Sequence, residues 1–168
     1  MGSMLAVLAV AFGHSERVLL GRVVLAFALS FVLGFEREVR GAPAGDRTYA
    51  MVGTAAAAVT AVTFLQSPQA IAGVLTGVGF IGGGMVWRES KGMITGLTSA
   101  AALFTVVAIG IVAGSGHGAL AIVVTALVLV DLELRHVPVL KHLDARRYVG
   151  MVRGDDDMPE KKSRATDS

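Results

Sequence analysis

The sequence predicts an all-α fold, a bundle of five transmembrane helices. Of its 168 residues, 54% are hydrophobic and only 17% are charged, and the mean hydropathy is +0.66. Apolar stretches of about 20 residues recur along the chain, which is the length that an α-helix needs to cross a bilayer. The charged residues gather between these stretches. We therefore expect a polytopic membrane domain over residues 17–137, preceded by an outer or interfacial segment over residues 1–16.

The first helix is predicted from Arg17 to Phe35. Arg22 lies less than two turns inside it. Two interpretations of this arginine remain open. Its long side chain can snorkel to the membrane surface, or it can face the bundle and form a pair there.

A charged loop over residues 36–48 separates the first helix from the second, and Pro43 and Gly45 in this loop are expected to end the first helix. Asp46 stands where a helix cap is expected. The second helix is predicted from Arg47 to about Leu65. Small residues over Gly53–Ala58 predict close contact with a neighbouring helix.

The third helix is predicted from Pro68 to Trp87, with Ser67 as its cap. Three consecutive glycines, Gly82 to Gly84, predict that this helix is interrupted or bent, because each interior glycine costs a helix about 0.5–1 kcal/mol relative to alanine. An unwound backbone persists in hydrocarbon only where protein buries it or where it lines a polar cavity. We therefore expect this segment inside the bundle, close to the functional site.

The remaining chain predicts two more spans and a tail. The fourth helix is expected to begin between Thr95 and Thr98 and to reach about Val112, and the fifth to run from Ala119 to Leu134. Residues 138–149 are expected to form a short interfacial helix. Residues 150–168, rich in charge, are typical of a disordered cytoplasmic tail.

The distribution of basic residues predicts the orientation. Five spans place the chain ends on opposite sides, and the loops rich in lysine and arginine face the cytoplasm. One set of loops holds Arg37, Arg40, Arg47, Arg88, Lys91, Arg135, Lys141, Arg146 and Arg147. The opposite set holds Arg17, with Arg22 at the edge of a span. We therefore expect a multi-pass membrane protein with its N-terminus outside and its C-terminus in the cytoplasm.

Several function classes are disfavoured. The chain has no cysteine, which excludes disulfides and thiol catalysis, and its positive charge forms no nucleic-acid-binding patch. The pattern Gly77-Val-Gly79-Phe-Ile-Gly82 matches a dinucleotide-binding motif, but that motif requires a preceding strand, whereas this copy lies in an apolar span. No histidine stands in a catalytic arrangement, and we predict that the chain is not an enzyme.

Two clusters are candidates for a site on the cytoplasmic face. Glu36, Glu38 and Asp46 are predicted to hold a hydrated magnesium ion, which needs only one or two carboxylates. The arginines beside them favour instead a network of salt bridges. The start of the fourth helix, facing the glycines, offers free backbone donors for an anion or a carbonyl group, although ordinary capping explains it equally. The residues predicted for the ligand site or structural network are Arg37, Arg47, Thr48, Gly77, Gly79, Gly82, Gly83, Gly84, Arg88, Thr95, Thr98, Ser99 and Asp131.

Three motifs resemble signatures of the MgtC/SapB family of bacterial membrane proteins. They are Gly34-Phe-Glu36-Arg37-Glu38 with Ala44-Gly45-Asp46-Arg47-Thr48, then Gly77 to Gly84 followed by Arg88, then Gly96 to Ala101. Their order and spacing match over roughly residues 17–136. The chain departs from the family at Asp46, where leucine is frequent, at Gly83, where alanine is frequent, and at Ser99. It resembles a short, SapB-like member without the ACT-like C-terminal domain.

The resemblance implies a five-span inner-membrane protein linked to magnesium limitation and, in pathogens, to survival inside host cells. One function is transport-like, with the site between the third and fourth helices beside the inner carboxylates. The alternative is a non-transporting regulator that binds partner membrane proteins, such as membrane ATPases, or small membrane peptides. The ion is expected to be magnesium or a related ion, and no cofactor other than magnesium is predicted. The small-residue faces predict a homodimer or higher homo-oligomer in the lipid bilayer.

Overall fold

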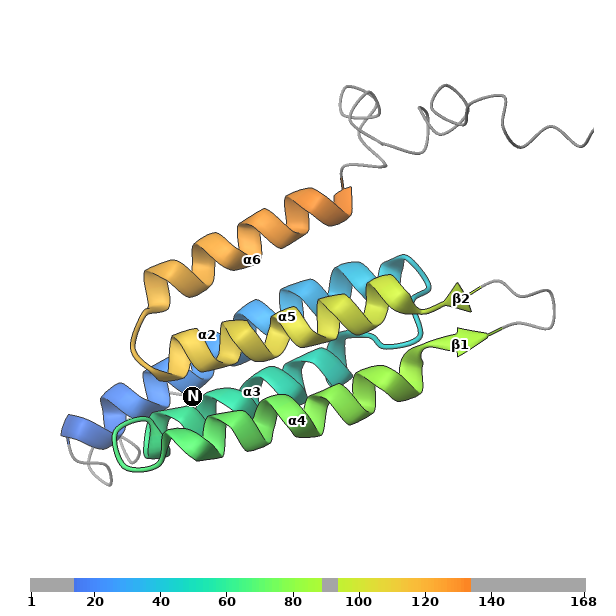
Figure 1. The fold of residues 1–168 in the computed structure, drawn as a ribbon. Coiled ribbons are helices and arrows are strands. Elements are labelled where there is room, and N and C mark those ends of the chain that lie inside the picture. The colour runs from blue at the N-terminus through green and yellow to red at the C-terminus, as the bar shows by residue number, and fades with distance from the viewer. Residues whose placement is uncertain (1–13, 89–93, 134–168) are drawn as a thin grey trace, which may run out of the picture. The chain divides into compact units, whose positions relative to one another are not determined.

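The computed structural model describes residues 14–88 and 94–133, and within them it forms five helices and two very short strands (Figure 1). The all-α prediction is confirmed at this level. The helices are α2 (His14–Val39), α3 (Asp46–Thr63), α4 (Pro68–Met85), α5 (Leu97–Gly114) and α6 (Gly118–Glu133). The strands are β1 (Trp87–Arg88) and β2 (Ile94–Thr95).

Two of the described helices are long and apolar enough to cross a membrane by length and composition. They are the stretch Ser15–Val39 of α2, with a hydropathy of 2.3, and α5, with a hydropathy of 2.1. The predicted interfacial helix and tail, residues 138–149 and 150–168, lie outside the described residues, as do residues 1–13.

Helices α2, α3 and α5 pack closely through small residues. A Cβ atom added to Gly110 of α5 would lie 2.5 Å from the carbonyl oxygen of Gly53 in α3, and one added to Gly114 would lie 2.5 Å from that of Ala57. On α2, the Oγ of Ser30 occupies the space that a side chain at Gly53 would need. The predicted close contact at residues 53–58 is thereby confirmed.

The interior of these three helices is apolar. Leu33, Leu103, Ile109 and two valines of α5 are fully buried there. Where the structure describes side chains, the buried polar residues are hydroxyl-bearing serines and threonines. The charged residues of α2 and α3 instead lie toward the helix ends.

Helix α4 is continuous, so the predicted interruption at Gly82–Gly84 is wrong. The helix runs through all three glycines and ends where the N–H of Val86 donates to the carbonyl of Gly83 at 3.3 Å. The physical reason is that a glycine removes only a side chain and leaves the helical hydrogen bonds in place. Where water is scarce, those bonds outweigh the modest propensity cost.

The surroundings of α4 also differ from the prediction. The structure describes the whole of α4, and Val78 is the one residue of this helix that is buried. Added Cβ atoms at Gly73, Gly77 and Gly79 meet nothing within 4 Å, and the same holds at Gly83 and Gly84. Among the described residues, these five glycines of α4 therefore lie in open space and not in the interior.

A narrow connection joins α4 to α5. Trp87 pairs with Thr95 and Arg88 with Ile94 in an antiparallel register. Gly96 follows with φ 82°, and its Cα lies so close to the carbonyl of Met85 that an added Cβ would overlap it. The residues between the two strands, 89–93, lie outside the described part of the chain.

Candidate functional site

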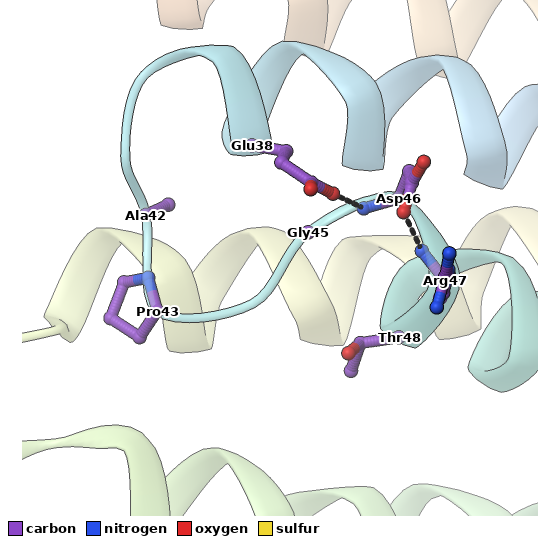
Figure 2. Close-up of a pocket in the computed structure, with 7 residues that line it drawn as sticks. All are labelled: Glu38, Ala42, Pro43, Gly45, Asp46, Arg47 and Thr48. Atoms are coloured by element: carbon purple, nitrogen blue, oxygen red, sulfur yellow. Dashed lines mark hydrogen bonds between the residues drawn. The ribbon is translucent and has the colours of Figure 1, made fainter.

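A cavity of about 490 Å³ lies at the connection between α2 and α3. It is lined by Glu38, Ala42, Pro43, Gly45, Asp46, Arg47 and Thr48 (Figure 2). Four of these residues, Glu38, Asp46, Arg47 and Thr48, are predicted site residues. Two carboxylates and one guanidinium therefore face a common space at one end of the helices.

The end of α2 shapes this cavity through a Schellman motif, in which a left-handed residue after the helix turns the chain back on itself. The N–H of Gly41 donates to the carbonyl of Glu38 at 2.9 Å, and that of Ala42 to Arg37 at 3.0 Å. Gly41 adopts φ 68°, which glycine tolerates best. The residue that ends α2 is therefore Gly41, ahead of the proline and glycine that the sequence analysis identified.

Glu38 caps the next helix. Its Oε2 accepts a hydrogen bond from the N–H of Asp46 at 3.0 Å, which satisfies one of the free donors in the first turn of α3. An added Cβ at Gly45 would meet this carboxylate, so the approach depends on glycine. Figure 2 shows the carboxylate of Glu38 pointing to this amide.

Asp46 occupies the first helical position and not the cap position, which belongs to Gly45. Its Oδ1 accepts from the N–H of Arg47. The predicted capping role of Asp46 is therefore corrected. The carboxylate that reaches across from the preceding helix is that of Glu38, eight residues earlier, and a local sequence pattern does not reveal it.

Glu36 is separated from this pair. Its carboxylate oxygens lie 3.5 Å from Nη1 of Arg37 and 3.4 Å from Nε of Arg40, and the Glu36 side chain is only 10% exposed. This is the salt-bridged alternative raised by the sequence. Among the described residues, no group of three or more metal-binding side chains comes together. The three predicted carboxylates thus divide into Glu36, held by arginines, and Glu38 with Asp46, which share the cavity.

Tyr49 is a contributor that the sequence analysis missed. It is fully buried, and its hydroxyl donates to the carbonyl of Ser99 in the first turn of α5 at 3.2 Å. Gly34 of α2 makes room for it, because an added Cβ there would lie 2.8 Å from the Tyr49 Cβ. The sequence feature that could have indicated this role is that Tyr49 is a single aromatic residue in the first turn of a helix otherwise rich in alanine.

Tyr49 therefore joins the cavity end of α3 to the start of α5. Ser99, predicted as a ligand through its position at a helix start, is buried and contributes its carbonyl to this contact. Thr98 beside it is exposed. The cap position of α5 is Gly96, and no side chain caps that helix.

The described residues that line the cavity do not include the other predicted residues. Gly77, Gly79, Gly83 and Gly84 lie on the open face of α4, and Gly82 approaches Ala100 of α5. Arg88 and Thr95 take part in the β1–β2 pairing through their backbones, and the structure does not describe their side chains. Asp131 belongs to a second compact unit that begins at Val130.

Comparison with known proteins gives one family and several relatives. A family model described as "MgtC family" matches residues 23–138. An uncharacterized protein of Haemophilus influenzae is 29% identical over 137 residues, which cover 73% of this chain and 58% of that protein. A protein of Escherichia coli K12 named "Putative magnesium transporter YhiD" is 34% identical over 128 residues, covering 68% and 59%.

A third relative, named "Protein MgtC" in Brucella abortus, is 36% identical over 106 residues, which cover 58% of this chain and 44% of that protein. The chain thus spans somewhat more than half of the length of the first two relatives, 58% and 59%. No solved structure matches it.

Proposed function

Because this chain belongs to the MgtC family, we propose that it is an inner-membrane protein of magnesium homeostasis whose α2–α3 cavity binds a hydrated magnesium ion. The family resemblance seen in the sequence motifs is confirmed by the match over residues 23–138. One relative is named for magnesium transport, which favours this ion over others. The observation that carries the proposal is the pair of carboxylates, Glu38 and Asp46, that line one cavity.

The chemistry of the cavity suits magnesium. This ion keeps most of its waters and binds through one or two carboxylates, so the absence of a third ligand among the described residues is no obstacle. Six waters at about 30 Å³ each occupy roughly 180 Å³. A cavity of about 490 Å³ accommodates that volume. A carboxylate has about four acceptor positions, so the capping bond of Glu38 leaves further ones for coordinated water.

Arg47 lines the same cavity and opposes the ion by its positive charge. We propose that it sets a weak affinity, so that occupancy follows changes in magnesium concentration. Replacement of Arg47 by glutamine is then expected to tighten magnesium binding. The side chain is exposed, and its removal leaves the backbone hydrogen bond to Asp46 intact.

We propose that all five helices span the membrane, with the N-terminus outside and the cavity at the cytoplasmic face. The basic residues of the α2–α3 connection support this orientation by the positive-inside rule. The two helices that meet the criteria for a span, α2 and α5, pack in one bundle with α3. Cysteine-accessibility labelling at Thr48 and Gln66 tests the topology, because the two positions are expected on opposite sides.

The open face of α4 bears on how the protein acts. The fully buried residues of the described bundle are uncharged. We propose that α4 pairs with α4 of a second copy in a homo-oligomer. A transport-like function would then use the assembly. The alternative, a regulator of partner membrane proteins such as membrane ATPases or small membrane peptides, uses the same face for a different protein.

Magnesium titration of the purified protein by calorimetry tests the cavity. Glu38→Gln and Asp46→Asn are each expected to weaken binding about tenfold or more, since each removes one of two charges from the site. Glu16→Gln, at the opposite end of α2, is the matched control. Equal affinity in the wild type and both cavity variants would reject the site.

Liposomes loaded with a magnesium-sensitive dye separate the two modes of action. Flux that the cavity variants abolish supports the transport-like function. Magnesium binding without flux, together with membrane ATPases that copurify with the wild type, supports the regulator.

A further inference from the structure

A second cavity, of about 310 Å³, lies at the other end of the α2–α3–α5 bundle. Its lining includes Arg22 of α2, Val62 of α3, Phe64, Leu65 and Gln66 beyond α3, and Ser115 after α5. It combines one arginine with an apolar wall. The magnesium proposal uses none of these residues.

Arg22 is held in place by the end of α5. Its Nη1 donates to the carbonyl of Gly114 at 3.3 Å, and the guanidinium packs against Gly116, where an added Cβ would lie 2.9 Å from Nη2. Gly116 adopts φ 97°, which allows the chain to pass this closely. A cation at the C-terminal end of a helix is also favoured by the helix dipole. The Arg22 side chain therefore contacts the end of α5, as the bundle-facing interpretation expects.

The charge of Arg22 is not balanced by a carboxylate in the part of the chain that the structure describes. The ion pairs there join Arg37 and Arg40 to Glu36, at the far end of α2. A guanidinium offers five N–H donors, and the bond to Gly114 uses one. A partly buried arginine without a counter-charge, beside a cavity, is a binding group for an anion.

The apolar wall identifies the kind of anion. Leu65 is 86% exposed, Val62 66% and Phe64 43%. A small water-soluble anion gains nothing from such a surface, whereas a lipid places acyl chains against it and its phosphate beside the arginine. We propose that this cavity binds the phosphate group of an anionic phospholipid of the outer leaflet. The inference rests on the proposed membrane-spanning arrangement, which sets this end of the bundle at the outer interface.

Native mass spectrometry of the detergent-solubilised protein tests the proposal with three probes. Phosphatidylglycerol is the expected ligand, diacylglycerol has equivalent acyl chains without phosphate, and inorganic phosphate has no chains. The wild type is expected to retain phosphatidylglycerol and to release the other two. Equal retention of diacylglycerol, or displacement of the lipid by equimolar inorganic phosphate, would overturn it.

Two variants act on the cavity by different routes. Arg22→Gln removes the positive charge. Gln66→Glu adds a negative charge, which repels the lipid phosphate, at an exposed position and with a side chain of nearly the same shape. Both are expected to weaken phosphatidylglycerol binding about tenfold or more, since charged hydrogen bonds to phosphate are the strong ones. Arg17→Gln, on the same helix and exposed, is the control and should bind normally.

A purely structural role of Arg22 at the end of α5 predicts a different result. Arg22→Gln would then lower stability, while Gln66→Glu would bind the lipid like the wild type, and that outcome refutes the proposal. If Arg22→Gln does not fold, Gln66→Glu alone decides. Carbonate extraction of each variant from membranes, with the magnesium titration, distinguishes failure of this site from failure of the proposed function.

Discussion

Two glycine-bearing faces of this molecule have similar composition and opposite surroundings. On α3 and α5, Gly53, Gly110 and Gly114 are each pressed against backbone or side chains of a neighbouring helix. On α4, Gly73 and Gly77 meet nothing of their own chain. A glycine-rich face indicates that a close approach is favourable, but it does not say whether the approaching helix belongs to the same chain.

The difference follows from what stands opposite each face. Across from the glycines of α5 are Ala56, Ala57 and Thr60 of α3, and small residues on both sides let the backbones approach. Among the described residues, most of α4 is left exposed, and Phe80 on it is 87% exposed. The packed face holds α2, α3 and α5 together within one chain. The open face of α4 is the surface through which we propose that two copies of the chain associate.

The largest effect is expected at the packed face. Gly53→Val places a side chain where Ser30 and Val106 already lie, so helices α2, α3 and α5 must separate. We expect a loss of about 1–3 kcal/mol or more in the free energy of unfolding. Thermal unfolding followed by circular dichroism measures it. Gly77→Val is the control, and an equal loss in both variants would erase the distinction between the two faces.

Gly77→Ile is expected to leave the monomer folded and to abolish self-association. A Cβ atom added at Gly77 meets no described atom within 4 Å, and a bulky side chain there prevents the close approach of a second α4. Chemical crosslinking in native membranes, with wild type and variant at equal expression, measures the dimer fraction. Only monomer in the wild type would reject the homo-oligomer, and an unchanged dimer in the variant would place its interface elsewhere.

An intermediate effect is expected at Gly96, where α4 is joined to α5. Alanine there is forced into left-handed backbone geometry, which costs about 1–2 kcal/mol, and its methyl group overlaps the carbonyl of Met85. Limited proteolysis of the α4–α5 connection should be faster in Gly96→Ala than in Leu97→Ala, a neighbouring exposed position. Equal rates would show that α4 is not held by this junction.

Much of the fold was predictable because the signals are local. Apolar stretches and turn residues fix where each helix lies, and the small residues over 53–58 predicted close packing. The break at Gly82–Gly84 was wrongly predicted because propensity was weighed without the hydrogen bonds that a helix keeps in an apolar setting. Propensity is a weak guide when tertiary or solvent effects compete.

The candidate site was less predictable because its contacts join residues distant in sequence. Glu38 reaches the first amide of α3, and Tyr49 reaches the carbonyl of Ser99, fifty positions on. The charged loop indicated where the site lies. It did not show that Glu36 pairs with arginines while Glu38 shares a cavity with Asp46, because alternating positions on a helix point in different directions.

The smallest effect gives the most sensitive test of the open face. Gly73→Ala adds one methyl group to α4 in space that this chain leaves empty. In a monomer, alanine should stabilise the helix by about 0.5–1 kcal/mol, because glycine loses more backbone freedom on folding. In the proposed assembly, the same methyl group holds two helices apart and should lower the dimer fraction. Unfolding in detergent measures the stability of the monomer, and crosslinking in membranes measures the dimer fraction. A gain in stability without any loss of dimer would mean that Gly73 lies outside the interface, whereas opposite signs in the two measurements would identify it as a contact between copies.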